Sequence, residues 1–139
     1  MVDENEQSDA LADRIDAIED AYEFMLAYAA QGRSGEDSTG PSANIRQYLE
    51  GAVAALDGLA AEFGARASGS KGDIGEQYQA FLDVLEEDSN KARAAVRLVL
   101  AQPKLSSQLI DNLNASIHLR ALLTDVFLVD EIAKDSQKT

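Results

Sequence analysis

The segment from Leu109 to Ile132 constrains the fold most, because it has the length of a helix and carries apolar side chains around most of its circumference. At about 100 degrees per residue, these side chains fall into two stripes on nearly opposite sides of one continuous helix. The first stripe contains Ile110, Leu113, Ile117, Ala121, Thr124 and Leu128. The second contains Ala115, Leu119, Leu122, Val126 and Val129. A helix at the edge of a bundle needs one apolar side, so the second stripe predicts an additional packing partner.

Two explanations fit the second stripe. In the first, the stripe is a surface that contacts a second copy of the chain or another protein. In the second, a compact, skewed bundle buries the last helix at its centre, and the stripe is part of the internal core. We prefer the first explanation. We also assign Phe24 and Tyr28 to this surface, because these aromatic residues lie off the apolar core stripe of the first predicted helix. The predicted association surface is Phe24, Tyr28, Leu119, Leu122, Val126 and Val129.

Apolar residues also recur at steps of three and four in three earlier segments, which predicts helices over about 9–31, 42–67 and 73–102. Ser8 is the expected N-cap of the first, and the row Gly51, Ala55 and Gly58 in the second would let a neighbouring helix approach closely. In the third, Asp88 and Ser89 interrupt the apolar stripe. With no alternation typical of a strand, the sequence predicts an all-α protein, an antiparallel four-helix bundle that packs further into a helical homodimer.

A chain of 139 residues fits a single domain. We expect residues 1–8 to be a disordered N-terminus and residues 134–139 to be a frayed C-terminus. Residues 31–42 are rich in Gly, Ser and other turn formers, so we expect a flexible loop there.

The charge of the chain limits its partners. It has 25 acidic and 12 basic residues, a net charge of -13, which argues against binding nucleic acid or an anionic membrane directly. A basic protein is a simpler partner for such a chain. An acidic stripe on the first helix is most simply a solvated face, and it consists of Asp9, Asp13, Asp16, Asp20 and Glu23. The acidic start of the chain and the lack of a long uncharged apolar run predict a cytoplasmic protein without a membrane segment.

No catalytic or cofactor motif emerges from the sequence. The chain has no cysteine, which excludes disulfides and thiolate sites, and its single histidine is His118. Asp111, Asn114 and Asp125 share a strip with this histidine, so a weak metal cluster is conceivable, but a hydrogen-bonded histidine is the simpler interpretation. We therefore assign no metal, cofactor or catalytic residue and predict that the chain is not an enzyme.

These observations favour a non-catalytic interaction module, an adaptor, regulator or assembly factor that associates with itself and with another protein through apolar helix faces. The alternative is a helical bundle that binds a small apolar or aromatic molecule, with polar contacts from Tyr22, Tyr48, Tyr78 or His118. The substitution Leu122→Asp separates the two explanations of the second stripe. It would change association if the stripe is a surface and abolish helicity if the stripe is core.

Overall fold

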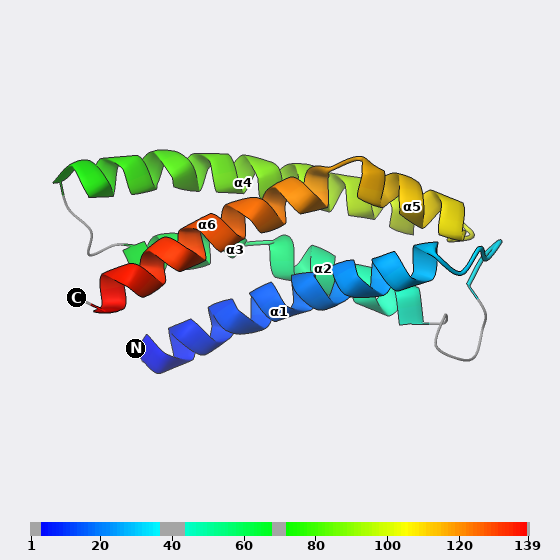
Figure 1. Ribbon diagram of the computed structural model, residues 1–139, viewed down its shortest axis with the longest axis horizontal. Coiled ribbons are helices and arrows are strands. Elements are labelled where there is room, and N and C mark those ends of the chain that lie inside the picture. Colours follow the sequence, from blue (N-terminus) through cyan, green and yellow to red (C-terminus); the bar gives the residue numbers. More distant parts are fainter. Residues whose placement is uncertain (1–3, 37–43, 68–71, 139) are drawn as a thin grey trace.

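The computed structural model describes residues 4–36, 44–67 and 72–138, and these are helical except at short connections (Figure 1). The helices are α1 (Glu4–Ala29), α2 (Ile45–Leu56), α3 (Leu59–Ala67), α4 (Gly72–Leu100), α5 (Ser107–Ala115) and α6 (His118–Lys138). No strand occurs within the described ranges. The prediction of an all-α protein is confirmed.

The helices pack side by side along one long axis (Figure 1). The chain runs out along α1, returns along α2 and α3, runs out again along α4 and returns along α5 and α6. α1 packs against α2 and α5, while α4 packs against α2, α3 and α6. Some of these pairs, such as α1 with α5, are far apart in sequence, and the apolar faces of the helices meet in one core.

Both ends of the described chain are more helical than the sequence suggests. α1 begins at Glu4, so Ser8 lies inside the helix and is not its N-cap. α6 continues to Lys138, into the segment that we expected to fray. Residues 1–3 and 139 lie outside the described part, as do residues 37–43, which include half of the predicted loop over 31–42.

The predicted helix over 42–67 is divided in two at Asp57 and Gly58. Asp57 has an extended backbone, and Gly58 has a φ of +83°, a conformation that glycine adopts without a steric penalty. Arg14 of α1 covers the exposed end of α2, because its Nη1 donates to the carbonyls of Ala55 at 3.0 Å and Asp57 at 2.6 Å. Within the row of small residues, Gly51 does not mark a close helix contact, since a Cβ on Gly51 would meet no atom within 4 Å.

The prediction of one continuous helix over 109–132 is wrong, because the chain breaks between Ala115 and His118. Ser116 closes α5, with its hydroxyl donating to the Leu113 carbonyl at 2.5 Å. Ile117 then adopts a φ of +65°, a left-handed conformation that costs a β-branched residue about 1–2 kcal/mol. The break ends the helical phase of α5, so α6 starts with a new orientation.

The break exchanges the roles of the two apolar stripes. Before it, Ile110 and Leu113 of the first stripe are buried. At the break and after it, Ile117 and Leu128 of the same stripe are 54% and 51% exposed. The buried side of α6 is formed by residues of the second stripe and their neighbour, namely Leu119, Leu122, Leu123, Val126 and Val129. The second stripe is therefore internal core along α6, which is the explanation that the sequence analysis did not prefer.

The end of the molecule where α1 meets α5 is held by buried polar contacts. The Tyr28 hydroxyl donates to the Leu105 carbonyl, and the Ser107 hydroxyl donates to the Tyr28 carbonyl at 2.7 Å. Arg33 and Ser107 also exchange two hydrogen bonds of 2.8 Å, from the Ser107 amide to the Arg33 carbonyl and from the Arg33 amide to the Ser107 hydroxyl. These bonds fix the start of α5, whose N-cap is Ser106.

Arg46 of α2 ties the same end together from the other side. Its guanidinium donates to the carbonyls of Leu100 at 3.0 Å and Gln102 at 2.8 Å, which lie at the end of α4. Its Nε lies 2.5 Å from a carboxylate oxygen of Glu36. Burial raises the pKa of the Glu36 carboxyl, but hydrogen bonds from the Leu105 amide and Arg46 outweigh burial and hold the pKa below its usual value. This carboxylate is fully partnered.

Candidate functional site

The six residues predicted to form an association surface are mostly internal. Phe24 is half-buried, and its ring stacks on Tyr48 of α2 with 4.3 Å between the ring centroids. The other five are at most 3% exposed within this single chain, namely Tyr28, Leu119, Leu122, Val126 and Val129. The structure therefore corrects the sequence assignment. For the four residues of α6 the physical reason is the change of helical phase at Ser116 and Ile117, whereas Tyr28 is buried by its contacts with Leu105 and Ser107.

The apolar surface of this helix lies on the side away from the core. We define the outer face of α6 as Arg120, Thr124, Phe127, Leu128, Glu131 and Ile132, all of which are exposed. At 100 degrees per residue, these positions fall within an arc of about 140 degrees. Phe127 and Leu128 are 55% and 51% exposed, so two large apolar side chains at consecutive positions of α6 are in contact with water. Large apolar side chains exposed together on one face are characteristic of interaction surfaces.

The charges of the outer face have opposite signs at its two ends. Arg120 lies one turn before Thr124, and Glu131 lies one turn after Phe127. Arg120 and Glu131 are eleven residues apart, so their Cα atoms are separated by about 16 Å along the helix axis. The face thus has a cation near its start, an apolar centre and an anion near its end.

A second feature of α6 lies on the flank that faces α4. There the Asp125 carboxyl comes within hydrogen-bonding reach of Asp88 of α4. Burial, the hydrogen bond that a protonated carboxyl forms with Asp88 and the charge of Asp88 together raise the pKa of Asp125 to about 7. Its Oδ2 atom is buried and has no hydrogen-bond partner among the described residues. The carboxyls of Asp88 and Asp125 therefore lie close together in a poorly solvated part of the contact between α4 and α6.

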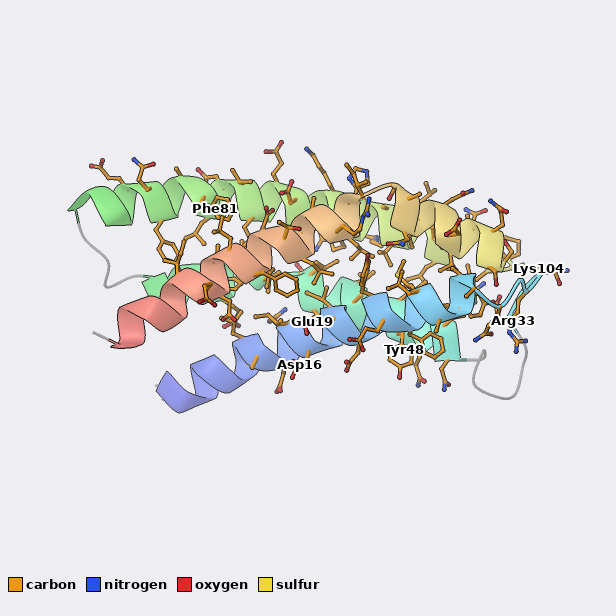
Figure 2. The ribbon with its side chains drawn as sticks, in the orientation of Figure 1. Asp16, Glu19, Arg33, Tyr48, Phe81 and Lys104 are labelled. Atoms are coloured by element: carbon orange, nitrogen blue, oxygen red, sulfur yellow. The ribbon has the colours of Figure 1, made fainter. Side chains whose placement is uncertain are left out.

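The acidic stripe of α1 lies mainly in solvent. Asp13, Asp16, Asp20 and Glu23 are exposed, whereas the side chain of Asp9 lies outside the described residues. Figure 2 shows Asp16 and Glu19 on α1, and Arg33 and Lys104 toward the other end of the molecule. Burial and the charges of four acidic neighbours, including Asp130 of α6, raise the pKa of Glu19.

The residues proposed for metal or small-molecule binding do not converge. Within the described ranges, no group of three or more acidic or histidine side chains is placed to hold a metal ion. The aromatic candidates lie on different helices, with Tyr22 on α1, Tyr48 on α2, Tyr78 on α4 and His118 on α6. Tyr48 lines a groove of about 320 Å³ between α1 and α2, together with polar residues such as Asp20, Asn44 and Gln47.

No protein-family model, curated protein or solved structure matches this chain. None of the helices in the described part is both long enough and apolar enough to cross a membrane. The geometry of the chain itself therefore carries the functional argument.

Proposed function

We propose that this chain is a non-catalytic interaction protein, an antiparallel four-helix bundle that pairs with a second copy of itself through the outer face of α6. The observation that carries this proposal is the exposure of Phe127 and Leu128, which lie between Arg120 and Glu131 along that face. Both belong to a helix whose opposite side is already covered by the rest of the chain. The rest of the chain does not cover Phe127 and Leu128, so shielding these two side chains from water requires a partner outside the chain.

The charge pattern favours a second copy as that partner. When two identical helices pack antiparallel around a twofold axis, residue i of one copy faces residue j of the other, and the reverse holds as well. If the axis passes between positions 125 and 126, Arg120 of each copy faces Glu131 of the other. Thr124 then faces Phe127 of the other copy, so Phe127 is covered in the same arrangement. The face is complementary to itself in this one orientation.

The expected dimer is weak. A single helix face offers less than the roughly 800 Å² that each partner buries in a standard interface. Each copy also carries a net charge of -13, which opposes association at long range. At 0.15 M salt the Debye length is about 8 Å, so repulsion between distant charges is largely screened while contacts in the interface remain. We expect dissociation constants in the micromolar range or weaker.

Sedimentation equilibrium at 0.15 M salt tests the apolar part of the proposal. We expect Phe127→Glu to convert the chain to a monomer without loss of helicity, because this side chain is exposed. Leu98→Glu is the matched control, since Leu98 is 67% exposed but belongs to α4. A wild-type chain that stays monomeric at high micromolar concentration would contradict the proposal. Equal dissociation by the Leu98 variant would place the interface on α4 instead.

Charge reversal tests the orientation. Arg120→Glu and Glu131→Arg each place like charges opposite one another in both symmetry-related pairs, so we expect each to weaken dimerisation roughly tenfold. The double variant Arg120→Glu with Glu131→Arg restores opposite charges and should recover most of the lost affinity. An additive loss in the double variant would argue against the antiparallel arrangement, and it would favour a different protein as the partner.

A further inference from the structure

The contact between α4 and α6 contains two carboxyl groups, although burying even one ionised carboxylate there costs free energy. Asp88 and Asp125 are both half-buried, and Oδ2 of Asp125 is buried without a hydrogen-bond partner in the described residues. Two ionised carboxylates cannot hydrogen-bond to each other, because neither has a proton to donate. A single proton between them supplies the missing donor and removes one of the two negative charges.

The charges around the pair do not neutralise it. On α4, Lys91 lies one turn beyond Asp88 but pairs with Glu87 on the exposed side, with 3.8 Å between the charged atoms. On α6, His118 precedes Asp125 by two turns on the same flank. The other two helices that contact α6 present further acidic residues: Asp111 of α5 is exposed, and Glu19 of α1 is acted on by the charge of Asp130, which lies at the opposite flank of α6. The charge that acts on Asp125 most directly is that of Asp88.

We propose that Asp88 and Asp125 share one proton across the contact between α4 and α6, and that loss of this proton loosens the contact. The shared proton lets one carboxyl donate to the other. Without it, two negative charges face each other in a half-buried place, and the least costly response is for the helices to separate and admit water. This behaviour is independent of the dimer proposed above, because it concerns a contact inside one chain.

The sign of the pH dependence follows from the raised pKa. The ordinary pKa of an aspartic acid is 3.8, and that of Asp125 in the folded chain is about 7. Between these values the folded chain holds a proton that the unfolded chain releases, so protonation favours folding. The stabilisation is fully present below pH 3.8 and is lost as the pH rises through about 7. The contact therefore responds to pH close to neutrality.

Thermal unfolding between pH 5.5 and pH 8.5 tests the proposal. We expect the wild-type melting temperature to fall over this range, and Asp125→Asn to remove most of the fall by raising the melting temperature at pH 8.5 by about 4 °C or more. Asp88→Asn should act in the same way, and the double variant should add little, because either substitution abolishes the repulsion. Asp83→Asn on α4 is the control for net charge, since Asp83 is exposed.

The result that would overturn the proposal is equally specific. If Asp125→Asn keeps the wild-type pH profile, or if Asp83→Asn flattens the profile as much, the effect is one of overall charge and not of this pair. Carboxyl ¹³C chemical shifts of the wild-type chain give a reading that does not depend on any variant. We expect Asp125 to titrate near pH 7, and a single transition below pH 5 would contradict the shared proton.

Discussion

The two sides of α6 have similar apolar side chains and opposite surroundings. On the inner side, Leu122 and Val126 are at most 1% exposed, whereas on the outer side Phe127 and Leu128 are more than half exposed. Composition does not separate the two sides, because both contain large apolar residues. The orientation in which α6 leaves Ile117 decides which side meets the core. A backbone break of two residues thus determines which surface is available to a partner.

The largest expected effect concerns the inner side. Leu122→Asp removes a fully buried leucine and places a carboxylate in the core, which should destabilise the chain by at least about 4 kcal/mol. Circular dichroism and urea denaturation measure the loss. Retention of full helicity and stability would mean that Leu122 faces solvent, and it would reverse the assignment of the two sides.

A smaller effect is expected at the break between α5 and α6. Ile117→Gly should stabilise the chain by about 1 kcal/mol, because glycine adopts a φ of +65° without strain and the exposed isoleucine side chain contributes little packing. Ile117→Ala keeps a Cβ and should show no such gain. Chemical denaturation compares the two. If glycine destabilises the chain more than alanine does, the segment is helical in solution and the two stripes lie on one continuous helix.

The smallest effect on stability is expected on the outer side. Leu128→Asp is the same substitution as Leu122→Asp, six positions later in α6. Because Leu128 is exposed, we expect the unfolding free energy of this variant to stay within about 0.5 kcal/mol of wild type. Chemical denaturation at low protein concentration isolates this effect from association. A loss of several kcal/mol would show that Leu128 is packed in solution, and the outer face would then be smaller than described.

The sequence predicted the helical class and the approximate extent of α1 and α4, because the spacing of apolar residues is regular there. It also contained a signal for the break at Asp57 and Gly58, since Asp-Gly is a common turn dipeptide, but this signal was interpreted as a row of small residues. The break at Ile117 had no comparable signal, because isoleucine is among the residues least expected at positive φ. That one missed feature turned the inner side of α6 into a predicted surface.

The carboxyl pair could be predicted only in part. Asp88 interrupts the apolar stripe of α4, and Asp125 lies in a polar strip, so each was visible as an exception to its helix pattern. Their contact depends on the register between α4 and α6. That register follows from the break at Ile117 and from the packing of the core, and neither is a local property of the sequence.

The chain contains no cysteine, so a single introduced cysteine reports directly on contact between two copies across the outer face of α6. In the antiparallel arrangement, the two Thr124 residues lie close to the twofold axis, whereas the two Ile117 residues are about 25 Å apart along the helices. We predict that Thr124→Cys forms an intermolecular disulfide under mild oxidation and that Ile117→Cys does not. No cross-linking at position 124, or equal cross-linking at both positions, would contradict pairing through this face.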